Sequence, residues 1–236
     1  MMNKVTAIVL AAGQGKRMNS PVAKQFLILR DKPVVYYCLR AFELSSVDEI
    51  ILVTGEGQVE YCREHIVKAY GFRKVSRIIE GGKERYDSVY QALKNCDSST
   101  YVLIHDGARP FIEVNSIEEI IRKVKECEAC IFAIPVKETI KVVDSNGFIT
   151  ATPDRTTLWA AQTPQAFTYE AIHNAYELFY QEKEKSGKTV TDDAMVYETY
   201  LGKQVSVVMG DYHNLKLTTP EDLVIAKQIL RQLSVR

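Results

Sequence analysis

The sequence lacks the features of a membrane protein or a nucleic-acid-binding protein. No apolar run approaches the roughly 20 residues that a transmembrane helix requires. Net charge is also absent, because 30 Lys and Arg residues balance 30 Asp and Glu residues. Such a chain has no overall field that would attract nucleic acid or an anionic lipid surface. We therefore expect neither a nucleic acid nor a membrane among its partners.

Cysteine is scarce, and its spacing shows no disulfide pattern. Five cysteines, an odd number, are typical of reduced thiols in a cytoplasmic protein. Cys127 and Cys130 form a lone C-x-x-C pair, without the second pair or the histidines that a metal site would need. The N-terminal MMNKVTAIVLAAG has an apolar run of only about half a dozen residues, too short for a signal peptide. We therefore expect a cytoplasmic location.

What the sequence does contain is an alternation of strands and helices. Apolar runs with β propensity occur at residues 4–13, 48–55, 75–82, 100–110, 130–136 and 203–211. Amphipathic helical stretches separate them, at 33–43, 59–69, 84–95 and 116–126. Near-continuous Ile, Val and Leu strands between such helices predict an α/β, Rossmann-like, mostly parallel sheet with helices on both faces. Since no linker or repeat interrupts the pattern, we expect a single domain over residues 1–236.

Three later segments carry local signals of their own. Residues 136–167 have β-branched runs around Asp-Ser-Asn-Gly at 144–147, which predicts a hairpin in a β-arm that projects from the sheet at about 136–157. Residues 180–194 are charged and contain glycine, which predicts a loop in which Thr191 caps the next helix. A last helix should begin at Pro220, capped by Thr219.

The first strand runs into an unusual loop, IVLAAGQGKRMNSPVAKQF, at residues 8–26. A dinucleotide fingerprint is excluded because Met18 stands where a third glycine is needed, and a Walker A loop because Arg17 replaces Ser or Thr. A glycine turn after a strand can nevertheless bind an anion through its N–H groups, and nearby cations can neutralise a polyphosphate. A purely structural turn with solvated cations explains the loop, taken alone, equally well.

The rest of the chain favours the phosphate. The pattern LAAGxGxRM, followed by a Lys before Gln-Phe, resembles nucleotidyltransferases that make nucleotide-sugar-like products. Further motifs follow in order: GGKERYDSV (81–89), HDGARPF (105–111), TPDRTTLWAAQTPQAF (152–167), TDDA (191–194) and NLKLTTPEDL (214–223). Together they resemble the 2-C-methyl-D-erythritol 4-phosphate cytidylyltransferase family over essentially the whole chain. The resemblance implies a nucleotide-diphospho-sugar transferase fold, with CTP and a polyol phosphate as substrates and Mg²⁺ as cofactor, in isoprenoid biosynthesis.

The resemblance also implies a role for individual residues. Arg17 and Lys24 match the pair that stabilises the transition state at the α-phosphate, and Arg155 and Lys216 match the pair that holds the substrate phosphate. Further substrate contacts fall to Asp106, Arg109, Thr139 and Thr191. The residues that match the family's nucleotide pocket are small, namely Ala11, Ala12, Gly13, Gly15, Gly81, Gly82 and Ser88. A set rich in cations suits a reaction between two anions, which needs no His, Ser and Asp triad.

Two carboxylates are candidates for the metal. Asp106 ends the strand TYVLIHD, at the edge where open α/β sheets bind ligands, and could hold Mg²⁺ there. The alternatives for Asp106 are a simple turn or a salt bridge to Arg109. Asp211 is a second candidate ligand, with a less certain match to the family.

Two other functions stay open, and the resemblance adds a prediction about assembly. Ribitol-5-phosphate cytidylyltransferase shares the first loop, but tends to HDAVRPF where this chain has HDGARPF. A non-catalytic nucleotide-binding protein should have lost a charged catalytic residue, and none is missing. An isolated β-ribbon is marginally stable in water. The resemblance implies a homodimer through the arm, and we expect Thr139 and Arg155 to reach substrate on the partner subunit.

Overall fold

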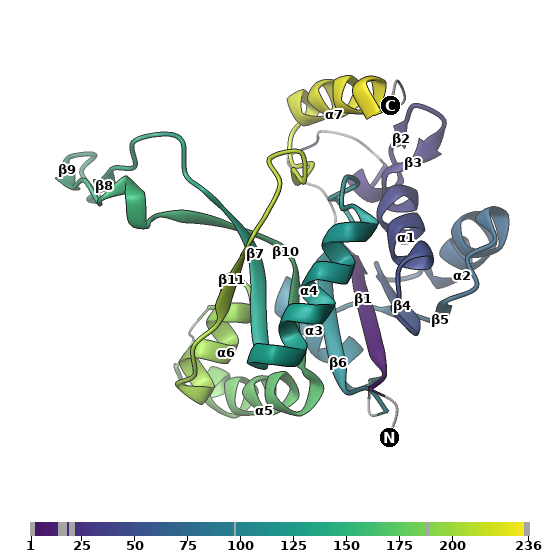
Figure 1. Cartoon of the computed structure of the whole chain (residues 1–236), viewed down its shortest axis with the longest axis horizontal. Helices are drawn as coiled ribbons and strands as arrows, with labels where there is room; N and C mark the ends of the chain where they lie inside the picture. Colours follow the sequence, from purple (N-terminus) through teal and green to yellow (C-terminus); the bar gives the residue numbers. More distant parts are fainter. Residues whose placement is uncertain (1–2, 14–17, 19–21, 97, 187–188, 234–236) are drawn as a thin grey trace.

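The computed structural model describes residues 3–13, 18, 22–96, 98–186 and 189–233, and its centre is a seven-stranded sheet (Figure 1). Its strands are β11 (Ser206–Met209), β7 (Ala129–Pro135), β10 (Trp159–Thr168), β6 (Tyr101–Asp106), β1 (Val5–Ala11), β4 (Glu49–Thr54) and β5 (Val75–Glu80), in that order across the sheet. Strand β10 runs antiparallel to both of its neighbours, and the other pairs are parallel. The predicted mostly parallel sheet is therefore confirmed.

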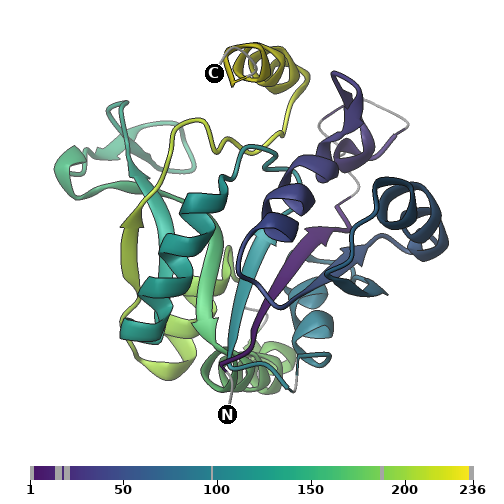
Figure 2. The same ribbon diagram turned by 45° about the vertical axis from the view of Figure 1, so that its right-hand side comes forward.

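Helices cover both faces of the sheet. One face packs against α1 (Val34–Leu44), α2 (Val59–Cys62) with its π-helical continuation η3 (Arg63–Lys68), and α4 (Val114–Cys127). The other face packs against α3 (Arg85–Leu93), α5 (Tyr169–Ser186) and α6 (Asp193–Leu201). In Figure 2, α1 (dark blue) and α4 (teal) lie in front of the sheet. Along β1, Ala7 and Val9 belong to the first layer and Ile8 to the second, so a continuous apolar run is buried on both sides.

A smaller apolar cluster lies beyond the carboxyl ends of the parallel strands (Figure 1). It contains the hairpin β2 (Ile28–Leu29) and β3 (Lys32–Pro33), which follows the 3-10 helix η2 (Lys24–Phe26), and the last helix, α7 (Pro220–Leu233). Helix α7 begins at Pro220, as predicted. The Asp222 carboxylate accepts the N–H groups of Thr218 and Thr219 at 2.7 and 2.9 Å, so Asp222 supplies a capping contact at this end.

The arm projects from the sheet, as predicted, but it is shorter than the 136–167 stretch. Its hairpin consists of β8 (Val142–Val143) and β9 (Ile149–Ala151), with η4 (Arg155–Thr157) on the way back to the sheet (Figure 1). Asp144 closes the predicted turn, since its Oδ1 accepts the N–H groups of Asn146 and Phe148, both at 2.9 Å. Gly147 has a φ of 86° there, which glycine adopts without strain.

The end of that stretch is instead strand β10, within the main sheet. The segment WAAQTPQAFT has few of the branched apolar residues that indicate a central strand. Its buried half contains Gln162, Thr163 and Gln165, whose polar groups bond to other segments. Polar residues buried in this way carry no hydrophobic signal, which is why the pattern failed to predict the strand.

The loop predicted over residues 180–194 is also wrong in its first half. Helix α5 continues to Ser186, because charged residues with good helix propensity extend a helix that Tyr176 and Phe179 anchor in the core. The capping residue of α6 is Asp192, whose Oδ1 accepts the Met195 N–H at 2.9 Å, and not Thr191. None of the described helices is long and apolar enough to cross a membrane.

Candidate active site

Asp106, the last residue of β6, is the centre of a cluster of cations at the carboxyl edge of the sheet. Lys216 Nζ lies 2.8 Å from its Oδ2, and Arg85 Nε lies 3.3 Å from its Oδ1. Arg109 Nε is 3.6 Å from Oδ2. Burial by itself would raise the pKa of Asp106, but the charges of Arg85, Lys216 and Arg109 outweigh it and hold that pKa far below its usual range. Asp106 is therefore ionised and bound on both oxygens.

Arg109 is placed by a tight turn after β6. A Cβ at Gly107 would lie 2.9 Å from the Leu10 carbonyl oxygen, so this close approach requires glycine. Arg109 Nη1 donates to the Asn214 carbonyl at 2.7 Å, but its Nε is a buried donor without a hydrogen-bond acceptor among the described residues. That Nε faces Asp106 Oδ2 at 3.6 Å, so Arg109 is held between the Asn214 carbonyl and the Asp106 carboxylate.

His105 holds this turn, and sequence reasoning assigned it no function. Its ring is fully buried on β6, with Nδ1 3.1 Å from Thr163 Oγ1 and Nε2 3.2 Å from the Arg109 carbonyl oxygen. A neutral ring that carries its proton on Nε2 satisfies both contacts, because Thr163 Oγ1 already accepts the Asp106 N–H. Burial lowers the pKa of His105 to about 4. His105 is therefore neutral at neutral pH, with both ring nitrogens engaged, and supports the structure of the site.

This buried imidazole predicts a loss of stability at mildly acidic pH. The folded state stabilises neutral His105, so the unfolded chain takes up a proton first as the pH falls from about 6.5 towards about 4. Between pH 7 and pH 5 we expect His105 to reduce the unfolding free energy by about 2 kcal/mol. Urea denaturation at both pH values, of the wild type and of His105→Asn, measures this. An equal pH dependence in both proteins would contradict the assignment.

Several of the small residues predicted for the nucleotide meet in one turn. Strand β5 ends before Gly81 and Gly82, and Ser88 lies in the first turns of α3. The Gly82 N–H donates to Ser88 Oγ at 3.1 Å. A Cβ at Gly81 would lie 2.5 Å from Ser88 Oγ and 2.7 Å from the Ala12 side chain, so these three residues are in contact range. Ala11 is the last residue of β1 and directly precedes Ala12, and Gly13 is exposed. We call Ala12, Gly81, Gly82 and Ser88 the glycine turn.

The structure describes only some of the cations predicted to be catalytic in and after the first loop. Arg17 and Gly15 lie outside the described residues. Lys24 is the first residue of η2, and the next residue, Gln25, is buried and donates from Nε2 to the Ala11 carbonyl at 2.5 Å. That bond places Lys24 at the carboxyl end of β1, the same edge of the sheet as Asp106.

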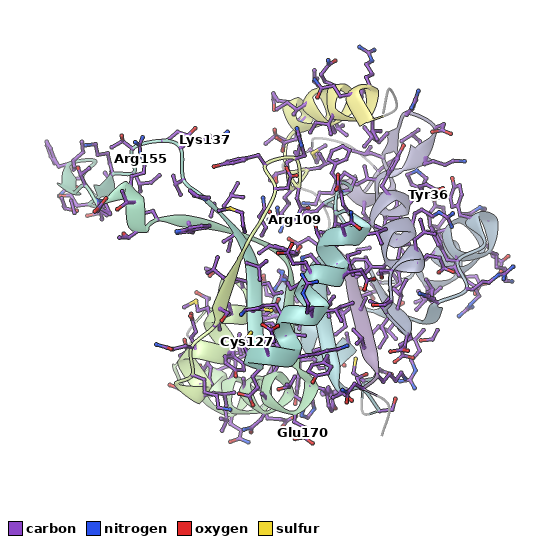
Figure 3. The ribbon with its side chains drawn as sticks, viewed as in Figure 1. Tyr36, Arg109, Cys127, Lys137, Arg155 and Glu170 are labelled. Carbon is purple, nitrogen blue, oxygen red and sulfur yellow. The ribbon has the colours of Figure 1, made fainter. Side chains whose placement is uncertain are left out.

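Among the described residues, the other predicted substrate contacts form no hydrogen bond or ion pair with Asp106, and two of them lie on the arm. Thr139 is exposed on the arm. Arg155 donates from Nη1 to the Lys137 carbonyl at 3.0 Å, and Figure 3 shows both of these residues on the arm, away from Arg109. Thr191 is exposed and faces Met195 Sδ, 3.5 Å from its Oγ1. Of the predicted substrate set, the structure therefore brings together Asp106, Arg109 and Lys216.

The predicted metal ligands do not form a fitting site for Mg²⁺. Three cations surround Asp106, and a divalent ion added there would meet their repulsion. Asp211 is exposed, and its Oδ1 accepts the His213 N–H at 2.7 Å. The part of the chain that the structure describes has no group of three His, Cys, Asp or Glu residues that could hold a metal. The alternative, a salt bridge from Asp106 to Arg109, describes the arrangement better.

Sequence reasoning missed two residues of the cluster, Arg85 and Asp193. Arg85 Nη1 and Nη2 donate to the two carboxylate oxygens of Asp193 at 2.9 and 2.7 Å, while Nε donates to Asp106. Both residues lie inside motifs that were recognised, GGKERYDSV and TDDA. Their charges were the available signal, but nothing in the sequence showed that the two motifs meet.

Comparisons with known proteins agree in sequence and in fold. A sequence profile of the family described as 2-C-methyl-D-erythritol 4-phosphate cytidylyltransferase matches residues 5–232. The chain is 50% identical to the protein of that name from Lachnoclostridium phytofermentans over 233 residues, 98% of each chain. It is 47% identical to that from Alkaliphilus oremlandii over 232 residues, 98% of this chain and 96% of the relative. Among solved structures, the 4-diphosphocytidyl-2C-methyl-D-erythritol synthase from Anaerococcus prevotii matches with a TM-score of 0.84 and 31% identity, over 97% of this chain and 96% of that one.

Proposed function

The chain belongs to the 2-C-methyl-D-erythritol 4-phosphate cytidylyltransferase family, and we propose how its residues serve the two substrates. It is a nucleotidyltransferase of isoprenoid biosynthesis, which transfers CMP from CTP to methylerythritol phosphate and releases pyrophosphate. The comparisons do not favour ribitol-5-phosphate cytidylyltransferase or a non-catalytic nucleotide-binding protein.

The cluster at Asp106 is the observation that carries the assignment of the substrate phosphate. Three cations, Arg85, Arg109 and Lys216, face two carboxylates, Asp106 and Asp193, which leaves one excess positive charge at the edge of the sheet. Arg109 has a buried donor without an acceptor among the described residues, and Lys216 is about one-third exposed. We assign the phosphate of methylerythritol phosphate to Lys216 and Arg109, since cations in a partly buried site bind phosphate well.

We assign the nucleotide to the glycine turn. The glycine turn offers backbone donors and acceptors that can read the edge of cytosine, and its small side chains let a base approach that backbone closely. Ala11 and Gly13 precede and follow Ala12 there, and Gly15 extends the same loop. This assignment rests on the family resemblance and on the contact between Ala12, Gly81 and Ser88.

The reaction needs charge stabilisation more than proton transfer. An oxygen of the substrate phosphate attacks the α-phosphorus of CTP, a new P–O bond forms, and the bond to the departing pyrophosphate breaks. A phosphate monoester is largely ionised at neutral pH and requires no general base. We propose that Lys24 and Arg17 stabilise the charge on the α-phosphate and the leaving group, and that Arg155 and Lys216 position the attacking phosphate.

Mg²⁺ remains the proposed cofactor of the reaction. Because neither Asp106 nor Asp211 fits it, the oxygens of a bound triphosphate, which are ligands that Mg²⁺ prefers, would hold the ion. The chain's own contribution at Asp106 is then an arrangement of cations, with Asp106 as their common counter-ion.

A homodimer through the arm is proposed from the composition of its surface. The arm exposes large apolar side chains on a short two-stranded ribbon, and Phe148 and Ile149 are 70% and 62% exposed. Five apolar residues there are more than one-third exposed, namely Ile140, Val142, Val143, Phe148 and Ile149. Such a ribbon is marginally stable unless another surface covers it, and a second copy of the arm is the occupant that the family resemblance implies. A cytoplasmic location is proposed as well, since all five cysteines are free thiols.

The function is tested with a panel of substrates. With CTP, Mg²⁺ and methylerythritol phosphate we expect release of pyrophosphate, and at least a hundredfold lower kcat/KM with ATP or GTP, because a purine edge leaves backbone groups that would bond cytosine unpaired. A coupled pyrophosphate assay measures these rates, with ribitol 5-phosphate as the competing acceptor. Faster turnover of ribitol 5-phosphate would contradict the proposed substrate.

A further inference from the structure

Arg85 connects the two halves of the proposed active site. It is the first residue of α3, so it lies three residues after Gly82 of the glycine turn. Its Nε donates to Asp106 Oδ1 at 3.3 Å, and its other two nitrogens hold Asp193 as a bidentate pair. One side chain thereby joins the strand end that gathers the phosphate-binding cations to the turn assigned to cytosine.

The start of α3 is itself held in a fixed geometry. The Glu84 N–H donates to Asp87 Oδ2 at 3.0 Å within a capping box. On the far side, Asp193 is fully buried and its Oδ1 also accepts the Tyr176 hydroxyl at 2.6 Å. Arg85 is therefore anchored at its backbone and at its guanidinium tip, and little freedom remains for its Nε.

The two oxygens of Asp106 have different partners. Oδ1 is bound by Arg85, and Oδ2 is bound by Lys216 at 2.8 Å and approached by Arg109. With Oδ1 fixed, the plane of the carboxylate is fixed, and so is the direction from which Lys216 is held. Without Arg85, the carboxylate could rotate and present both oxygens to Lys216 and Arg109.

We propose that Arg85 is a positioning residue, which acts through Asp106 to fix the Lys216 ammonium relative to the glycine turn. Each guanidinium nitrogen of Arg85 donates to a carboxylate, so Asp106 and Asp193 together set the orientation of this side chain. The inference rests on the proposed function of Lys216 as a ligand of the polyol phosphate. Its consequence is that Arg85 sets the distance between the attacking phosphate and the bound nucleotide.

The experiment must separate this role from the stability of the fold. Replacing Arg85 alone leaves a buried, charged Asp193 without its partner, which destabilises the protein. The double variant Arg85→Gln with Asp193→Asn removes both charges and lets two amides meet, so it should fold. Tyr176→Phe is the matched control, because it removes another hydrogen bond of Asp193 and leaves the contact from Arg85 to Asp106 intact.

We expect the double variant to lower kcat/KM for methylerythritol phosphate by about a hundredfold, the cost of misplacing a reacting group by about 1 Å. The change should appear both in kcat and in the KM for methylerythritol phosphate, because a misplaced ammonium binds the phosphate less well and holds it away from the α-phosphorus, while the KM for CTP changes by less than about threefold. Tyr176→Phe should lower Tm without changing either KM. Wild-type kinetics in a folded double variant would overturn the proposal. So would a KM for methylerythritol phosphate that rises in Tyr176→Phe along with its drop in Tm, because loss of stability would then explain the effect.

Combination with Lys216→Ala shows whether Arg85 acts through Lys216. In that background the double variant should change the KM for methylerythritol phosphate by less than about twofold, since the group it positions is gone. A full and additive loss would overturn the proposal while leaving the function of Lys216 intact. If Lys216→Ala itself leaves that KM unchanged, the proposed function of Lys216 fails, and the inference about Arg85 fails with it.

Discussion

Replacement of Lys24 by methionine is expected to lower kcat about a thousandfold while CTP still binds. Lys24 begins η2 at the carboxyl end of β1, where the neighbouring Gln25 is tied to the Ala11 carbonyl. A cation at this position meets more negative charge in the transition state than in the bound substrate, because charge accumulates around the α-phosphorus as the two anions join. Methionine is an unbranched side chain of similar size that lacks the charge and the N–H donors of lysine. Steady-state kinetics give kcat, and calorimetry gives the Kd for CTP.

Lys216→Ala is the control for Lys24→Met, because it removes a cation from the same edge of the sheet with a different proposed task. It should mainly raise the KM for methylerythritol phosphate, since Lys216 binds Asp106 on the acceptor side of the site. The two variants therefore separate stabilisation of the transition state from binding of the acceptor. A change confined to the KM for CTP in Lys24→Met would refute its role in the transition state.

A mixed dimer of two inactive variants, with one Lys24→Ala subunit and one Arg155→Ala subunit, is expected to regain cytidylyltransferase activity. Arg155 lies on the arm, held by the Lys137 carbonyl and away from Arg109 (Figure 3). Because Arg155 lies on an exposed arm, it can contact a bound phosphate only if another protein surface packs against the arm. The exposed apolar residues of the arm favour a partner subunit as that surface. We therefore expect Arg155→Ala alone to cost at least a hundredfold in kcat/KM, as loss of a phosphate-positioning cation does.

The complementation has a quantitative expectation. With random mixing about half of the dimers are mixed, and each contains one complete site and one doubly damaged site, so roughly a quarter of wild-type activity should return. Co-expression with two different affinity tags gives verified mixed dimers. If Arg155 serves its own subunit, every site lacks one of the two residues, and a verified mixed dimer without activity would exclude the shared site.

The sequence by itself determined the layered fold and the family. Apolar runs such as residues 4–13 and 48–55 form strands that are buried on both faces. Strands buried in this way have nearly continuous apolar sequences, which can be recognised without the structure. The turn at 144–147 and the start of α7 at Pro220 were predictable for a similar reason, since both depend on local backbone geometry. The ordered motifs also identified the family, and with it the cations at Lys24, Arg109 and Lys216.

The tertiary structure alone decided where polar residues are buried and which charges meet. Strand β10 lies inside the sheet and buries the polar residues Gln162, Thr163 and Gln165. Their hydrogen-bond partners lie on distant segments, so no local sequence pattern predicted this strand. Asp106 was a candidate metal ligand until its neighbours were known. Its pairing with Lys216 spans 110 positions of the sequence, and Arg85 meets Asp193 across 108. Electrostatic energy depends on distance in space, and the chain brings these charges together only when the sheet forms.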